Sequence, residues 1–136
     1  MSKPLFVDTG YIIALINEKD DYHSQALALS EKYDGHRLVT TDAVLLEVGN
    51  ALSRIARQEA SLIIHQFETA DEVTLVRMNP TLFNNAMRWY DKYQDKTWGL
   101  VECLSFSVMS EMGLSTALAF DKHFTQAGFQ LAIYQN

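Results

Sequence analysis

Four acidic residues occupy positions where a charged side chain is expensive, within or at the end of apolar segments. Asp8 and Asp121 each follow a short apolar run, and Glu47 and Glu102 each interrupt one. A carboxylate in such surroundings costs several kcal/mol unless it is paired, hydrogen-bonded or bound to a metal ion. Most other acids lie in polar stretches and are typical of solvated surfaces and helix caps. These four residues are therefore the candidates for chemistry.

Basic partners for these carboxylates are scarce in the neighbouring sequence. Arg54 follows Glu47 by two helical turns, and Lys122 is adjacent to the last of the four acids. Glu102 has no basic residue within four positions. A group of carboxylates favours Mg²⁺ or Mn²⁺, which prefer oxygen ligands. Zinc is disfavoured, because the 4 histidines are scattered without the spacing of zinc ligands.

Each acid, taken singly, also has an ordinary structural explanation. Asp8 suits a turn, and Glu47 suits the solvated edge of a helix. Glu102 is long enough to reach a distant arginine, and Asp121 suits a cap for the segment 122–126. Because four separate coincidences are harder to accept than one shared site, we favour the interpretation as metal ligands.

The elements that must position these acids alternate between short strands and helices. Strand-like runs cover 5–7, 36–40, 73–76, 116–120 and 130–134. Helical patterns cover 11–17, 21–34, a long stretch from 42 past 55, 61–70, 79–93 and 99–111. Asp21 and Asp42 are expected to cap helices, as is Asn79, which precedes a proline. Gly35 and Gly113 are expected to end them.

Strands that alternate with helices predict an α/β fold of three layers, with a central parallel sheet of four to five strands flanked by helices. Such sheets bind ligands beyond the carboxyl ends of their strands. Asp8 and Asp121 fall at two strand ends, and Glu47 and Glu102 fall on helices that can point into the same crevice.

Length and composition limit the remaining possibilities. The 136 residues, of which 48% are hydrophobic, suit one domain over 1–136, and the single Cys103 excludes a disulfide framework. With 17 acidic against 11 basic residues, the chain is not expected to bind nucleic acid by bulk charge, which leaves phosphate contacts through metal ions. No apolar run suits a membrane span and no signal peptide is evident, so we expect a cytoplasmic protein without membrane contact.

Four segments, in order along almost the whole chain, resemble the motifs of PIN-domain nucleases. They are FVDT at 6–9, TTDAVLLE at 40–47, YQDKTWGLVECLS at 93–105, and ALAFDKHF at 117–124 followed by AGF at 127–129. The last two motifs are fairly specific, whereas the first is weak by itself. Each segment contributes one of the four acids.

The resemblance implies a PIN-like fold and a metal-dependent endoribonuclease that cleaves RNA with Mg²⁺ or Mn²⁺. Small members resemble the VapC-type toxins of bacterial toxin–antitoxin modules, which implies a homodimer and a cognate antitoxin. Matched to the family, the catalytic residues are Asp8, Glu47, Glu102 and Asp121. Asp8 and Asp121 are expected to bind metal directly, Glu102 next, and Glu47 through water.

Other residues are assigned weaker roles. Thr9 is expected to hydrogen-bond a carboxylate or phosphate, and Asp95 supports the third motif or caps a turn. Trp98 and His123 flank two acids, and packing for the first and exposure for the second are favoured over stacking on bases. Six basic residues are candidates for steering RNA, two of them on the helix of Glu47: Arg54, Arg57, Arg88, Lys92, Lys96 and Lys122.

Two departures from the family pattern keep an alternative open. The third acid is usually aspartate, so Glu102 is one methylene longer, and Ala119 stands where a hydroxyl is frequent. A catalytically weak or inactive interaction module would retain the fold without binding Mg²⁺ or Mn²⁺. A phospho-acceptor enzyme fits less well, because Gly10 replaces the second aspartate of haloacid dehalogenases and the late strand ends in Asp121 instead of the lysine of receivers.

Overall fold

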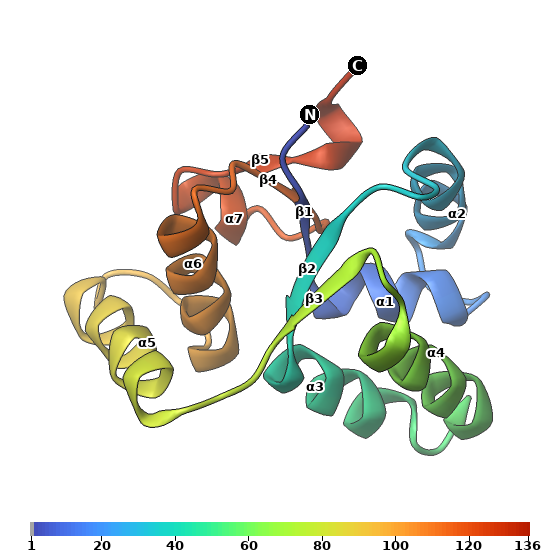
Figure 1. Ribbon diagram of the computed structural model, residues 1–136, viewed down its shortest axis with the longest axis horizontal. Helices are drawn as coiled ribbons and strands as arrows, with labels where there is room; N and C mark the ends of the chain where they lie inside the picture. Colours follow the sequence, from blue (N-terminus) through green and yellow to red (C-terminus); the bar gives the residue numbers. More distant parts are fainter. Residues whose placement is uncertain (1) are drawn as a thin grey trace.

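The centre of the molecule is a sheet whose strands are separated in sequence by helices (Figure 1). The computed structural model describes residues 2–136. Its strands are β1 (Leu5–Val7), β2 (Leu38–Thr41), β3 (Val73–Val76), β4 (Thr116–Leu118) and β5 (Gln130–Leu131). Its helices are α1 (Thr9–Ile16), α2 (His23–Lys32), α3 (Asp42–Leu52), α4 (Arg57–Thr69), α5 (Pro80–Lys92), α6 (Leu100–Met112), α7 (His123–Gln126) and the 3-10 turn η1 (Ala132–Tyr134).

Two layers of helices enclose the sheet. The strands are all parallel and are ordered β3-β2-β1-β4-β5. Figure 1 shows α1 to α4 on one side of the sheet and α5 to α7 on the other. Because crossovers are right-handed, helices change faces where the chain reverses its direction across the sheet, which happens between β3 and β4. The predicted three-layer α/β fold with a five-stranded parallel sheet is confirmed.

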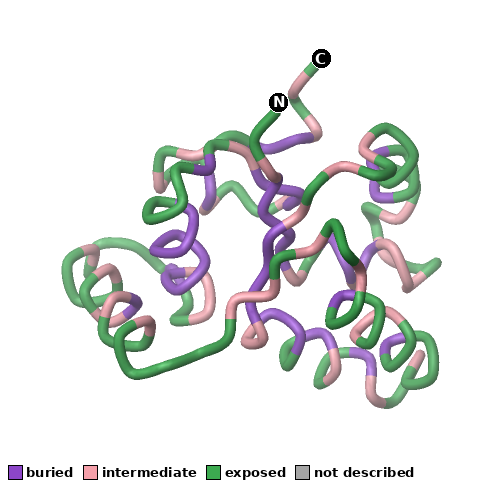
Figure 2. Tube along the Cα trace, viewed as in Figure 1, coloured by how far each residue is buried: buried purple, intermediate pink, exposed green. Residues whose placement is uncertain are grey.

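The central strand is apolar on both faces, as a strand covered by two helical layers must be. Phe6 and Val7 of β1 are completely buried. On the α5–α7 side, Phe106 of α6 packs edge-on against Phe124 of α7, with ring centroids 5.0 Å apart. Figure 2 shows the buried residues following the central strands and the inner face of α6. This core fixes the ends of β1 and β4 relative to each other.

The strand order places a crevice at the carboxyl ends of β1 and β4. Val7 pairs with Leu118 in the parallel register, and the backbone N–H of Asp8 donates to the carbonyl of Leu118 at 3.1 Å. Beyond this point the chain enters α1 on one face and α7 on the other. Such a topological switch point is where open α/β sheets bind ligands.

The helix that carries Glu47 is shorter than its apolar pattern predicted. α3 ends at Leu52, and Ile55 is 65% exposed instead of continuing the buried stripe. Arg54 therefore lies in the connection after α3, and Arg57 opens α4, so the prediction that both lie on the helix of Glu47 is wrong. α4 begins at Arg57, before the predicted residue 61. The prediction started too late because the first turn of α4 is polar and shows no apolar period.

Helix caps differ from prediction at two places and agree at a third. Thr41 caps α3, because its Oγ1 accepts from the backbone N–H of Val44 at 3.1 Å, while Asp42 accepts from the backbone N–H of Met78. Asp21 does not cap α2, which begins two residues later. Asn79 caps α5 as predicted.

The remaining boundaries are close to the predicted ones. Gly35 and Gly113 adopt φ of +75° and +66°, the left-handed conformation expected of them. β4 ends at Leu118, before the predicted residue 120, and β5 gives way to η1. Within residues 2–136, no helix combines the length and apolar character that crossing a membrane requires.

Candidate active site

Asp8 lies at the junction between β1 and α1, at the floor of the crevice. Its side chain is only 8% exposed, although it makes no capping bond to α1. Gly10 leaves room beside it, since a Cβ there would lie 3.9 Å from Asp8 Oδ2. The carboxylate of Asp8 is therefore buried at the end of a strand, and capping of α1 does not explain why it is there.

Glu47 approaches the same junction from α3. Thr9, the first residue of α1, donates its Oγ1 hydrogen to Glu47 Oε1 at 2.6 Å. This bond holds an otherwise exposed glutamate against the start of α1 and leaves its second oxygen available to accept. The structure thus gives Thr9 a carboxylate partner, one of the two contacts predicted for it.

Glu102 lies in the first turn of α6. Its Oε1 accepts from the backbone N–H of Gly99 at 3.0 Å, which caps the helix from the third position. Asp121, three residues beyond β4, is 44% exposed and accepts from the backbone N–H of His123 at 2.9 Å. The capping role considered for Asp121 is therefore present, whereas Glu102 caps α6 instead of reaching an arginine, and both roles coexist with the group of acids.

His123 is the member of this group that the sequence did not predict. Its Nδ1 lies 2.9 and 3.1 Å from the two carboxylate oxygens of Glu102 and 3.4 Å from Asp121 Oδ1. The predicted exposure is wrong, since the side chain is only 19% exposed. The signal for it was its place two residues after Asp121, where a tight turn brings the imidazole back to the carboxylates.

The electrostatics of Asp8 show that the four acids face one crevice. Burial, the largest cause, and the negative charges of Glu102, Glu47 and Asp121 together raise the pKa of Asp8 from 3.8 to about 7, against a hydrogen bond from the Thr9 backbone that lowers it. Within residues 2–136, no lysine or arginine lies within 4.0 Å of the four carboxylates. In the part of the chain that the structure describes, the ring nitrogen of His123 is the basic atom that contacts two of them, Glu102 and Asp121.

Two other predicted site residues lie apart from this group. Asp95 is exposed and pairs with Lys96 at 3.1 Å, which lowers the pKa of its carboxyl group. Trp98 is buried and donates from Nε1 to Gln126 Oε1 at 2.9 Å, so the packing role favoured for it is confirmed. Arg54, Arg57 and Lys122 are exposed and make no ion pair among the described residues.

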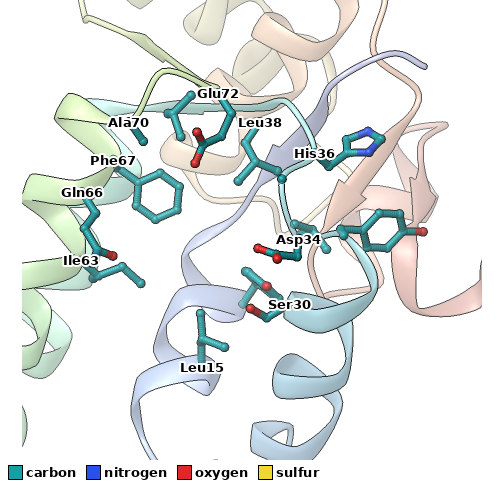
Figure 3. A pocket seen from close by; sticks show the side chains of 15 residues that line it. Leu15, Ser30, Asp34, His36, Leu38, Ile63, Gln66, Phe67, Ala70 and Glu72 are labelled. Atoms are coloured by element: carbon teal, nitrogen blue, oxygen red, sulfur yellow. The ribbon is translucent and has the colours of Figure 1, made fainter. Parts of the chain in front are cut away.

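A pocket of about 260 Å³ lies elsewhere, between α1, α2 and α4 (Figure 3). Figure 3 shows Leu15, Phe67 and Ile63 around an apolar interior, with Ser30 and Glu72 at its polar margin. None of the four acids lines it. This pocket is therefore separate from the group of acids.

The acidic crevice fits a hard divalent cation. Ligand atoms of Glu102, Asp121 and His123 lie within 4.8 Å of one another, close enough to share one ion. Asp8 supplies a buried carboxylate that lacks a basic partner and whose charged form would be stabilised by a cation. The donors are mainly oxygens, as Mg²⁺ and Mn²⁺ prefer.

A parallel sheet with an acidic switch-point crevice is the arrangement of a metal-dependent nuclease, and comparison with known proteins defines the class. The PIN domain family model matches residues 5–130, so the chain belongs to the PIN domain family, whose members are metal-dependent nucleases.

One curated relative and two solved structures are similar to the chain. The chain is 29% identical over 125 residues to the 23S rRNA-specific endonuclease VapC20 of Mycobacterium tuberculosis, covering 92% of this chain and 95% of the relative. The crystal structure of that VapC20, described as a sarcin-ricin loop cleaving toxin, superposes with a TM-score of 0.83 at 28% identity over the same shares. FitAcB from Neisseria gonorrhoeae, at 9% identity and a TM-score of 0.62 over 93% and 95% of the two chains, shares the fold.

Proposed function

We propose that this protein is a metal-dependent endoribonuclease and the toxin of a toxin–antitoxin module. The observation that carries the proposal is the buried carboxylate of Asp8, which faces three further acids and no basic side chain. A charge arrangement of this kind destabilises the fold in the absence of a cation, so its retention is best explained by the chemistry of a bound one.

The four acids have two proposed roles: three of them bind the cation, and the fourth orients a water molecule. Asp8, Glu102 and Asp121 would hold Mg²⁺ or Mn²⁺, which when bound neutralises phosphate charge and lowers the pKa of water. Asp8 gives up its proton on cation binding, because only the carboxylate is a ligand. Glu47, with one oxygen fixed by Thr9, presents the other to orient a water molecule at the crevice.

Substrate and partners are proposed from the relatives. VapC20 is named for 23S rRNA, so ribosomal RNA is the first substrate to test, and a cognate antitoxin and a homodimer complete the proposal. We place the protein in the cytoplasm, where that RNA is found. Exposed Arg54, Arg57 and Lys122 are positioned outside the acidic group and are available for RNA phosphates.

The activity is tested by incubating the purified chain with ribosomal RNA and transfer RNA in Mg²⁺ or Mn²⁺, with and without a chelator. We expect defined cleavage products only when the cation is available. Cleavage that persists in excess chelator would contradict a metal-dependent mechanism. Intact RNA under every cation condition would instead favour the inactive interaction module.

Thr9 provides a test of the water-placing role. Replacing Thr9 with valine removes the hydroxyl that holds Glu47 while keeping the branched shape, so we expect RNA cleavage to fall about 10-fold. The melting temperature should change little. Thr9→Ser, which keeps the hydroxyl, is the matched control and should cleave nearly as fast as the wild type. Equal losses in both variants would show that the hydroxyl is not the operative group.

A further inference from the structure

The imidazole of His123 faces two of the proposed metal ligands instead of solvent. Nδ1 lies 2.9 Å from Glu102 Oε1 and 3.4 Å from Asp121 Oδ1. It is the one nitrogen donor of the ligand group that Glu102, Asp121 and His123 form. A donor nitrogen held between two carboxylates is placed where a shared cation would be bound.

The position of His123 is fixed by packing and not by its side chain alone. Its backbone N–H donates to Asp121 Oδ1, and the next residue, Phe124, is completely buried against Phe6 and Phe106. The buried side chain of Phe124 therefore fixes the position of the neighbouring imidazole. Such preorganisation is what a metal ligand requires, because mobile ligands lose affinity to the entropy of ordering them.

The far side of the ring also has a suitable partner. Thr97 Oγ1 lies 3.4 Å from His123 Nε2. Metal-bound histidines usually donate their other ring N–H to a neighbouring oxygen, which fixes the tautomer. In the tautomer in which Nε2 donates to Thr97, Nδ1 keeps a lone pair for a cation shared with Glu102 and Asp121.

We infer that His123 is a further ligand of the proposed cation site and contributes one nitrogen to its carboxylate set. This inference rests on the proposed function, since it concerns the same cation. A nitrogen donor favours Mn²⁺ over Mg²⁺, because Mg²⁺ selects oxygen ligands more strictly than the transition metal does. The site is thereby tuned toward Mn²⁺.

The test is pulsed electron paramagnetic resonance of Mn²⁺ added to the chelator-treated full chain. We expect nitrogen modulation in the wild type, a change in that modulation when the protein is labelled with ¹⁵N-histidine, and its loss in His123→Gln. The affinity of His123→Gln for Mn²⁺ should fall about 10- to 100-fold, and its affinity for Mg²⁺ should fall less. His65→Gln, which alters an exposed histidine of α4, is the matched control and should match the wild type.

Each other outcome has a definite meaning. Bound Mn²⁺ without nitrogen modulation in the wild type overturns the inference while leaving the carboxylate site in place. Modulation that survives in His123→Gln assigns the nitrogen elsewhere and also overturns it. Failure of the wild type to bind Mn²⁺ overturns the cation site of the proposed function and the inference with it. Labelling of the wild type shows whether the nitrogen belongs to a histidine, and His123→Asn assigns it to this residue where His123→Gln does not fold.

Discussion

Replacing Asp8 with asparagine is expected to abolish RNA cleavage and, in the absence of cations, to raise the melting temperature at pH 7.5. Cleavage should fall at least about 100-fold, because the substitution removes the buried ligand and its charge from the site. Stability should rise because asparagine has the same shape and accepts the same backbone hydrogen bond, while it removes a charge that burial and three neighbouring acids disfavour.

The size of the stability gain follows from the shifted pKa of Asp8. A shift from 3.8 to about 7 corresponds to a cost of up to about 4 kcal/mol for the charged form at neutral pH. A gain of about 2 kcal/mol in the free energy of unfolding, half of that cost, is enough to raise the melting temperature by at least about 5 °C for a chain of this length. Differential scanning calorimetry in chelator measures it.

Asp71→Asn is the control for this prediction, since Asp71 is an exposed acid between α4 and β3. It should change neither cleavage nor melting temperature. An Asp8→Asn protein that cleaves RNA at the wild-type rate would remove Asp8 from the mechanism. One that is less stable than the wild type at pH 7.5 would mean that the carboxylate is satisfied within the fold.

The second large effect is the pH dependence of stability in the metal-free protein. Because the pKa of Asp8 is higher in the folded state than in the unfolded state, folding favours the protonated form. The stability due to this group is therefore complete below about pH 4 and is lost as the pH rises from about 4 to about 7. In Asp8→Asn the loss is absent, so the difference in melting temperature between the two proteins should grow across that range.

Cations should reverse the sign of that difference. Mn²⁺ or Mg²⁺ binds the deprotonated carboxylate, so a saturating cation is expected to raise the melting temperature of the wild type at pH 7.5 and to leave Asp8→Asn nearly unchanged. Removal of the cation with a chelator should restore the lower value. A melting temperature for wild-type protein that is constant from pH 4 to pH 7.5 in chelator would contradict the shifted pKa.

The sequence pointed to these acids because the cost of a charge in an apolar segment is visible in the sequence itself. Asp8 and Asp121 end apolar runs, and parallel strands bring their carboxyl ends to one edge of a sheet. That Glu47 joins them depends on how α3 packs on α1, and this follows from tertiary contact that no local pattern encodes. The sequence showed only that its helix could point toward the strand ends, and the resemblance to a family added the match to a catalytic acid.

The predictions that were wrong concern residues whose surroundings depend on where a turn or a helix ends. His123 was predicted to be exposed because a lone histidine in a polar stretch has no periodicity, and only the turn after Asp121 returns it to the carboxylates. Ile55 continued an apolar stripe in sequence, but the helix had already ended at Leu52. Asp95 shares a motif with Glu102, yet its side chain is exposed and pairs with Lys96 at the surface.

Calorimetric titration of Mn²⁺ and Mg²⁺ into the chelator-treated chain tests most directly whether four distant carboxylates create one cation site. We predict saturable binding to the wild type and to Asp71→Asn, and its loss in both Asp8→Asn and Asp121→Asn. Absence of binding to the wild type, or equal binding to all four proteins, would contradict the shared site and leave a PIN domain without the chemistry proposed for it.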